Sequence, residues 1–327
     1  MNHRRHFLAF AAATGLLGTR QSIAQPFTGP PLSFLVPQPA GNPTDNLARR
    51  LQIATQRELG QALVVENLPG AGGSLGVNKM LAAPTGTPVL MIASQTESIL
   101  TPLSVRSARY SSDNLRPVLL ITRGPYVLVG RPDLPAQNFQ ELMALARERS
   151  SRPLSHGHIG HGSMIHLLGE RLARKAGLSL IQVPYKGVPP VIQDLIGAQI
   201  DLAFVPQSSV RDLVSSGKLK AFGTTAASAS ERLATVPPIS RQESALSDFV
   251  HGTWAAVFVA RSLPEAEVRR LNQALSVACH DAQFQAQTAA SGSDPAPPMT
   301  LVELERFFDS EIRLYQSMAR EMGLRPE

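Results

Sequence analysis

The chain has 327 residues, of which 43% are hydrophobic, and a formal net charge of +6 with a single cysteine, Cys279. A chain of this length is expected to form about two domains. The mild charge, the few aromatic residues and the lack of a dense basic run argue against a nucleic-acid partner, and one cysteine excludes an internal disulfide or an all-cysteine metal site.

Residues 1–24 have the pattern of an export signal. Arg4 and Arg5 form a basic start, residues 7–18 are an apolar run, and residues 22–24 are a small-residue cleavage site. The pair Arg4-Arg5 ahead of Phe7 resembles a twin-arginine signal, and the general secretory route stays open. The apolar run is shorter than the ~20 residues of a membrane-spanning helix, so we expect a cleaved signal rather than an anchor. The sequence therefore predicts a periplasmic protein.

The segment after the signal begins with a strand, a loop and a helix. Residues 32–36 are apolar and end at Pro37, which is typical of a buried strand followed by a turn. Asn42 is a candidate helix cap, and Asp45 is placed to return a hydrogen bond to the cap amide. Apolar residues then recur on one face until Gly60, a typical left-handed helix end.

The same alternation recurs along the chain and predicts a mostly parallel sheet with helices on both faces. Further strands are predicted at 62–66, 89–93, 180–183 and 200–205, and helices at 163–176, 187–197 and 301–322, while 157–162 is interpreted as a loop. Residues 126–130 and 253–260 are interpreted as strands that cross between two lobes. On this interpretation residues 26–124 plus 253–327 form lobe 1, and residues 125–252 form lobe 2.

Loops that lead into helices are the candidate binding sites, because ligands of such sheets lie beyond the carboxyl ends of the strands. In the loop 37–45, free amides and a helix N-terminus suit an anion, although an ordinary connection fits equally well. Further along, Tyr185 offers a hydroxyl and an aromatic wall ahead of Gly187. Lys186 between them is placed either to neutralise a carboxylate or to be solvated.

Two other motifs give alternative functions. Residues 72–76 match the Gly-x-Ser-x-Gly pattern of a hydrolase, with Ser74 as nucleophile and Asp201 and His251 as conceivable partners. A Pro-Gly turn separates Ser74 from the preceding strand, which favours a loop chosen for backbone shape. The segment 156–166 contains four histidines, and His156, His158 and His161 are candidate metal ligands. Their spacing matches no standard metal site, so we favour an anion-facing loop at 160–163.

Taken in chain order, these segments resemble the Bug-type receptors of tripartite tricarboxylate transporters over nearly the whole mature chain. The resemblance is carried by residues 36–41 with 44–45, 65–67 with 69–73, 160–163 with His166, and most specifically 183–187 with Pro190 and 194–195. It implies an α/β, two-lobed periplasmic-binding-protein fold of type II, with two Rossmann-like domains joined by two crossover strands. It also implies a binding protein rather than an enzyme, without a cofactor or a metal.

The resemblance further implies a function and a site. The expected function is a periplasmic receptor, a monomer, that captures a di- or tricarboxylate, an acidic amino acid or an aromatic acid for uptake by membrane permease subunits. The anion would be held by loop amides, hydroxyls and ordered waters. Carried over by position, the ligand-binding residues are Gly41, Asn42, Thr44, Asp45, Ser94, Gln95, Thr96, Gly162, Ser163, His166, Tyr185, Lys186 and Gly187.

Five residues depart from the family pattern. Gln38 stands where an aromatic residue is usual, Asn42 replaces a glycine, and Ser74 replaces a common asparagine. Ile159 stands where small residues are frequent, and Glu97 adds a carboxylate near the expected mouth. The loss of an aromatic wall and the gain of an amide favour a more polar ligand.

Overall fold

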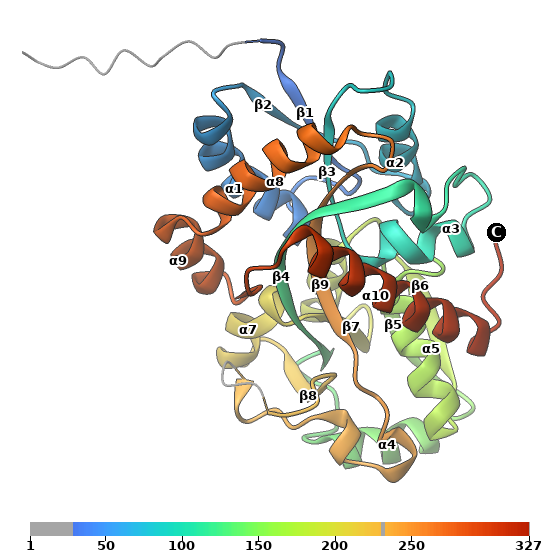
Figure 1. Ribbon diagram of the computed structural model, residues 1–327. Coiled ribbons are helices and arrows are strands. Elements are labelled where there is room, and N and C mark those ends of the chain that lie inside the picture. Colours follow the sequence, from blue (N-terminus) through green and yellow to red (C-terminus); the bar gives the residue numbers. More distant parts are fainter. Residues whose placement is uncertain (1–28, 230–232, 327) are drawn as a thin grey trace, which may run out of the picture.

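The computed structural model describes residues 29–229 and 233–326, and the predicted export signal lies outside these ranges. Strands and helices alternate, which confirms the predicted α/β class (Figure 1). The first elements are β1 (Leu32–Val36), α1 (Pro43–Leu59), β2 (Leu63–Asn67), α2 (Ser74–Leu81), β3 (Val89–Ala93), a π-helical turn (Thr96–Leu100), α3 (Thr101–Ser104) and β4 (Leu115–Gly130). They are followed by α4 (Phe139–Glu148), β5 (Leu154–His158), α5 (Met164–Ala176), β6 (Leu180–Pro184), α6 (Val188–Ile196), β7 (Leu202–Pro206), α7 (Gln207–Ser215) and β8 (Lys220–Thr224). The last are β9 (Gly252–Ala260), α8 (Glu265–Cys279), α9 (Ala282–Ala290), β10 (Asp294–Pro295) and α10 (Leu301–Glu321).

The strands form a mixed sheet in the order β2-β1-β3-β9-β4-β7-β5-β6, with β8 and β10 also paired to β4. β1 is parallel to β2 and β3, and β5 is parallel to β6 and β7. β9 is antiparallel to β3 and β4, and β4 is antiparallel to β7. We call β1, β2, β3, β9 and residues 115–125 of β4 the first sheet region, and β5, β6, β7, β8 and residues 126–130 of β4 the second sheet region.

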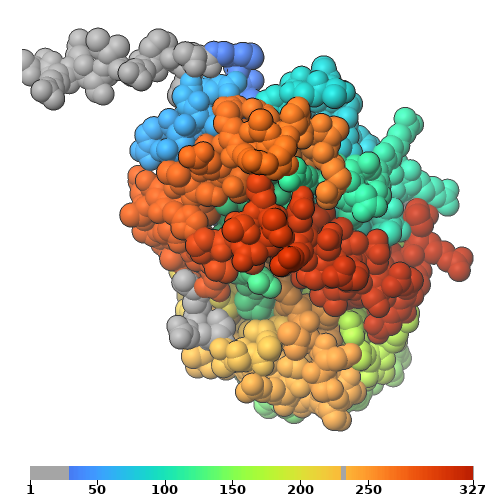
Figure 2. All heavy atoms as spheres, in the orientation of Figure 1, coloured from blue at the N-terminus to red at the C-terminus, as the bar shows by residue number. Residues whose placement is uncertain are grey.

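The chain passes between the two sheet regions at two adjacent points. Within β4, Pro125 is the last residue paired with β9, and Tyr126 is the first residue paired with β7. The chain returns at Gly252, which is paired with Pro125 and begins β9. The segment 126–130 therefore lies in the second region and β9 lies in the first. The C-terminal helix α10 runs across the middle of the molecule in this view (Figure 2).

The helix ends show how local sequence sets these elements. Gly60 and Gly177 end α1 and α5 with φ of +60° and +65°, as their sequence context predicts. Ser163 caps α5 by accepting a hydrogen bond from the His166 amide at 3.3 Å. Two expectations are wrong. The Asn42 side chain does not cap α1, because it is bonded elsewhere, and part of the expected loop 157–162 is strand β5.

Apolar side chains fill the space between the sheet and the helices on both of its faces. Phe34 and Leu51 are buried where α1 covers the first sheet region, and Phe204 and Leu168 are buried where α5 covers the second. α8 packs against α1, which places helices from the two ends of the chain side by side (Figure 1). None of the helices in the described ranges combines the length and the apolar character that crossing a bilayer requires.

Candidate functional site

A cavity of about 420 Å³ lies between the two sheet regions, which is within the range of small-molecule sites. It is enclosed by loops at the carboxyl ends of parallel strands, three from the first region and two from the second. After β1, β2 and β3 the lining residues are Pro37, Gln38, Pro39, Asn42, Pro69, Gly70, Ala71, Gly72, Gly73, Thr96, Glu97 and Thr101. After β5 and β6 they are Ile159, His161, Ser163, Tyr185, Lys186 and Gly187.

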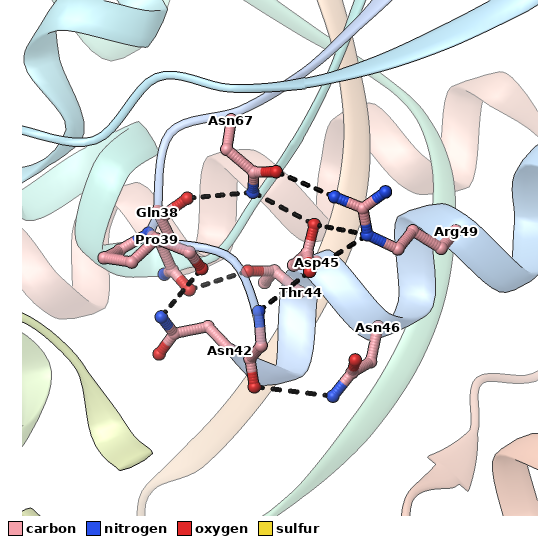
Figure 3. Close-up of polar contacts among 9 residues, drawn as sticks. Gln38, Pro39, Asn42, Thr44, Asp45, Asn46, Arg49 and Asn67 are labelled. Atoms are coloured by element: carbon pink, nitrogen blue, oxygen red, sulfur yellow. Dashed lines mark hydrogen bonds and ion pairs between the residues drawn. The ribbon is translucent and has the colours of Figure 1, made fainter. Parts of the chain in front are cut away.

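The loop after β1 is held in shape by a buried carboxylate (Figure 3). Asp45 accepts hydrogen bonds from the Gly41 amide at 2.9 Å and from Asn67 Nδ2 at 3.0 Å, and it pairs with Arg49 at 3.1 Å. Burial by itself raises the pKa of Asp45, but the Gly41 amide, Arg49 and Asn67 outweigh burial and hold the pKa below its ordinary value. Asp45 therefore orders the loop and lies behind the cavity lining.

Asn42 joins this loop to the second sheet region. Its Nδ2 donates to the Pro39 carbonyl at 2.9 Å, and its Oδ1 accepts from the Val188 amide at 3.1 Å. Val188 is the first residue of α6, so Asn42 serves the N-terminus of a helix in the other half of the molecule rather than its own. A Cβ at Gly187 would lie 2.9 Å from Asn42 Nδ2, so a larger residue there would have to displace the Asn42 side chain.

The loop after β2 has an unusual backbone. Gly70, Ala71, Gly72 and Gly73 all have positive φ, from +47° to +128°. Three glycines make this run of left-handed residues accessible. A Cβ at Gly73 would lie 2.6 Å from Glu97 Cγ, so the loop packs directly on the Glu97 side chain.

Glu97 is the carboxylate of the cavity and is only 2% exposed. Its Oε2 accepts from the Ser94 amide at 2.9 Å and from Ser94 Oγ at 2.7 Å. Its Oε1 accepts from Gln38 Nε2 at 2.6 Å, and Gln38 Oε1 accepts in turn from Thr44 Oγ1 at 2.6 Å. Ser94 and Thr44 thus position Glu97 and Gln38 from behind.

Gln95 lies away from the cavity, at the junction of the two sheet regions. Its Nε2 donates to Tyr126 Oη at 2.8 Å and to the Gly252 carbonyl at 3.1 Å, and its Oε1 accepts from the Trp254 amide at 3.4 Å. Tyr126 and Gly252 are the residues at which the chain passes between the regions. Gln95 therefore joins both crossings to the end of β3.

The loop between β5 and α5 contributes Ser163 and His161 to the cavity. Ser163 Oγ donates to the Gly160 carbonyl at 2.7 Å, and Gly162 donates from its amide to His166 Nδ1 at 3.2 Å. The His166 ring packs between the rings of His158 and His161 at centroid distances of 4.6 and 5.1 Å. Burial and these neighbouring histidines lower the pKa of His166 to about 3, which keeps the ring neutral.

Two further contacts connect this loop to the first sheet region. Thr96 Oγ1 accepts from the Met164 amide, the first of α5, at 3.3 Å. Gly162 lies against Ser104, because a Cβ at Gly162 would be 2.1 Å from Ser104 Cβ. Thr96 therefore accepts from the first amide of α5, as Asn42 accepts from the first amide of α6, and both bonds join the two sheet regions.

The loop between β6 and α6 forms the wall that can hold an anion. Tyr185 Oη donates to Asp194 at 2.6 Å, so its ring faces the cavity as an apolar surface while burial raises its pKa to about 12. The Lys186 side chain is exposed, and Gly187 is buried. The Gly187 amide has no hydrogen-bond partner among the residues that the structure describes. A cationic side chain and a free N–H group thus meet where α6 begins.

The structure places six of the thirteen predicted site residues on the cavity lining, namely Asn42, Thr96, Ser163, Tyr185, Lys186 and Gly187. Gly41 lines a second cavity of about 370 Å³ between α1, α6 and α7. Thr44, Asp45, Ser94, Gly162 and His166 lie behind the lining and hold it, and Gln95 lies at the junction of the two sheet regions. The predicted ligand-binding set omits His161 and the segment 69–73, and the sequence analysis gives Gln38 and Glu97 only as departures from the family pattern. The position of all of these shortly after a strand end is the signal that identifies them.

The two alternative functions lack the geometry that they need. Ser74 is fully buried, with its Oγ 3.3 Å from Ser107 Oγ, and Asp201 is engaged by Ser155 and Arg131. These contacts leave neither Ser74 nor Asp201 available to the predicted triad. His156 is bonded to Gln182 at 2.9 Å inside the core. In the described ranges, no three His, Cys, Asp or Glu side chains are grouped so as to hold a metal ion.

Comparisons with known proteins agree with one another over most of the chain. A family model described as "Tripartite tricarboxylate transporter family receptor" matches residues 47–324. The UPF0065 protein in the TAR-I ttuE-ttuC' intergenic region of Agrobacterium vitis is 30% identical over 328 residues, which is 99% of this chain and 92% of that protein. The periplasmic binding protein BugD superposes with a TM-score of 0.82 at 26% identity, over 91% of this chain and 99% of BugD. MatC from Rhodopseudomonas palustris with bound malate gives a TM-score of 0.80 at 26% identity, over 88% and 98%. The predicted periplasmic-binding-protein fold is confirmed.

Proposed function

Because this chain belongs to the tripartite tricarboxylate transporter receptor family, we propose that it captures a small carboxylate in the cavity between its two sheet regions for uptake across a membrane. The chain is a solute-binding receptor and not an enzyme. The observation that carries the proposal is that one cavity receives strand ends from both regions, with Lys186 and the free Gly187 amide at the start of α6. The structure of MatC with malate supports a carboxylate as the class of ligand.

The start of α6 is the proposed position of the carboxylate. A helix N-terminus carries partial positive charge, and its first N–H groups lack partners within the helix. Here the Gly187 amide and the Lys186 ammonium add two donors at the cavity wall. Charge-assisted hydrogen bonds of this kind are about twice as strong as neutral ones. A di- or tricarboxylate, an acidic amino acid and an aromatic acid all present the required group.

We further propose that residues 26–124 with 253–327 and residues 125–252 act as two lobes that close on the ligand. Between the cavity walls the direct hydrogen bonds include those from Val188 to Asn42 and from Met164 to Thr96. Since a ligand touching both walls adds contacts only in the closed arrangement, it shifts the population toward that arrangement.

The cellular setting is proposed on the same basis. BugD is a periplasmic binding protein, and the pattern of residues 1–24 fits export to that compartment. There the receptor, as a monomer, would pass its ligand to the membrane permease subunits of a tripartite transporter. No cofactor or metal has a role in this scheme.

Binding measurements on a carboxylate panel test the proposal. Thermal-shift screening followed by calorimetry should identify at least one stabilising di- or tricarboxylate, acidic amino acid or aromatic acid. Lys186→Ala should weaken that ligand about tenfold, or ~1.4 kcal/mol, because it removes the cation at the α6 wall. Lys218→Ala, which alters an exposed lysine outside the cavity lining, should leave affinity unchanged. The absence of stabilisation by any of these acids would overturn the function, and equal effects of the two variants would overturn the position.

A further inference from the structure

Glu97 places an acid inside a cavity that is proposed to bind acids. Its three hydrogen-bond donors, the Ser94 amide, Ser94 Oγ and Gln38 Nε2, are all neutral. In the described part of the chain, no lysine or arginine forms an ion pair with it. A buried carboxylate whose donors are all neutral gains further stabilisation from an opposite charge within hydrogen-bond distance. The ligand is the partner that this cavity can admit.

The opposite wall carries the opposite charge. Lys186 and the free Gly187 amide lie at the start of α6 in the second sheet region, whereas Glu97 follows β3 in the first. The lining also includes the apolar surfaces of Pro69, Ile159 and Tyr185. A ligand that spans the cavity therefore meets an acid at one end and donors at the other.

We propose that this site selects a carboxylate that also carries an ammonium group, with Glu97 as the residue that determines this specificity. This inference rests on the proposed function and narrows it to amino-carboxylates. The ligand carboxylate lies at the start of α6, and its ammonium group donates to Glu97. A dicarboxylate without an ammonium group is disfavoured, because its second carboxylate would face Glu97. Two like charges repel each other strongly where little water screens them.

The role of Glu97 in holding its own loop can be separated from its role toward a ligand. Glu97 accepts from the amide and hydroxyl of Ser94, three residues before it, which reproduces the glutamate half of a capping box. Glu303 accepts from the amide and hydroxyl of Thr300 in the same way, at 2.7 and 2.8 Å, and it is exposed at the start of α10. Glutamine can replace glutamate in a capping box. Glu97→Gln and Glu303→Gln are therefore matched changes, one inside the cavity and one outside.

Calorimetry with pairs of acids that differ only in the amino group tests the inference. The probes are L-aspartate with succinate, L-glutamate with glutarate, and L-phenylalanine with 3-phenylpropionate. For at least one pair the unaltered protein should bind the amino member at least tenfold more tightly. Glu97→Gln should reduce that ratio by at least tenfold, while Glu303→Gln should leave it unchanged, with circular dichroism confirming that both variants fold.

Several results would overturn the inference, and they differ from those that overturn the proposed function. If the unaltered protein binds the amino-free acids as tightly as their partners or more tightly, Glu97 does not select an ammonium group, whatever the variant does. If the ratio persists in folded Glu97→Gln, another residue selects the ligand. In both cases carboxylate binding itself stands. If no carboxylate of any kind binds, the proposed function fails and this inference fails with it.

Discussion

Gly187 and Asn42 show how a single methyl group can control the contact between the two sheet regions. A Cβ at Gly187 would lie 2.9 Å from Asn42 Nδ2 and 3.0 Å from Oδ1. The φ of Gly187 is 171°, an extended conformation that alanine adopts without strain. Any cost of Gly187→Ala therefore arises from displacing Asn42, whose Oδ1 accepts from the Val188 amide.

We expect Gly187→Ala to lower the free energy of unfolding by about 1 kcal/mol, the net value of one hydrogen bond. In an Asn42→Ala background the same change should cost nothing or stabilise slightly, because the obstructing amide is gone and alanine restricts the unfolded chain. Urea unfolding of the four proteins gives the coupling between the two positions. An equal cost in both backgrounds would show that the methyl group meets some other neighbour.

Local sequence could indicate which residues lie near the site, but not which neighbour each one contacts. Asn42 has the residue type and position of an N-cap for α1, yet its side chain accepts from the first amide of α6. That amide belongs to Val188, which is 146 positions further along the chain. The family resemblance implies that Gln95, which follows β3, binds ligand, but its side chain joins the two crossings. Both outcomes depend on how the regions pack, which no local pattern encodes.

At the scale of elements, β5 and α5 enclose histidines that are kept neutral. His156 is fully buried in β5, where its ring packs against Gly169 of α5 and is bonded to Gln182 of β6. Burial lowers its pKa to about 4, with a smaller effect of His158 in the same direction and an opposite effect of the Gln182 bond. Between pH 6.5 and 4 the unfolded chain therefore binds a proton at this residue that the folded protein does not.

The protein should lose stability as pH falls through this window, by up to ~1.4 kcal/mol per pH unit for each such histidine. His156→Asn, which retains a donor for Gln182, removes one such histidine. The free energy of unfolding should therefore fall less steeply with decreasing pH, by up to ~1.4 kcal/mol per pH unit. Urea unfolding between pH 7.5 and 4.5 measures it. His280→Asn, at an exposed residue after α8, should keep the slope of the unaltered protein. If His156→Asn also keeps that slope, the titration belongs to other residues.

The elements that the sequence predicts well have strong local patterns. The strand at 89–93 is an unbroken apolar run and has those bounds in the structure, and Gly60 and Gly177 end their helices as expected. Strand β5 was missed because His156, Gly157 and His158 lack the apolar character of a core strand. Their burial is possible because His156 has a polar partner in Gln182 and Gly157 leaves room for Ile200 and Val191.

At the scale of the whole molecule, Gln95 holds the two crossings together. Its three hydrogen bonds reach Tyr126, Gly252 and Trp254. Gln95→Ala removes a partner from the buried Tyr126 hydroxyl and Trp254 amide, at a cost of about 1–3 kcal/mol for the group most affected, while the Gly252 carbonyl keeps its bond from Tyr315 Oη. We expect amide exchange to accelerate at residues 124–126 and 252–254 in this variant.

Hydrogen exchange followed by mass spectrometry tests this expectation. Gln242→Ala is the matched control, because its Nε2 donates to the Phe222 carbonyl at 3.1 Å, wholly within the part of the molecule that contains the second sheet region. That variant should accelerate exchange near β8 only. Unchanged protection at both crossings in Gln95→Ala would mean that strand pairing alone holds them.

The shared strand β4 also limits the path by which the two regions can separate. Residues 115–125 are fixed to β9 and residues 126–130 to β7, so neither end of the strand can slide. Within β4 the partner changes from β9 to β7 at the junction of Pro125 and Tyr126, and the proline ring fixes one torsion there. Since Gly252 pairs with Pro125, the return segment lies beside that junction. For the lobe closure proposed above, the pairing leaves a twist about this junction, and ligands of different shape would differ in how far the proposed lobes close rather than in the route they take.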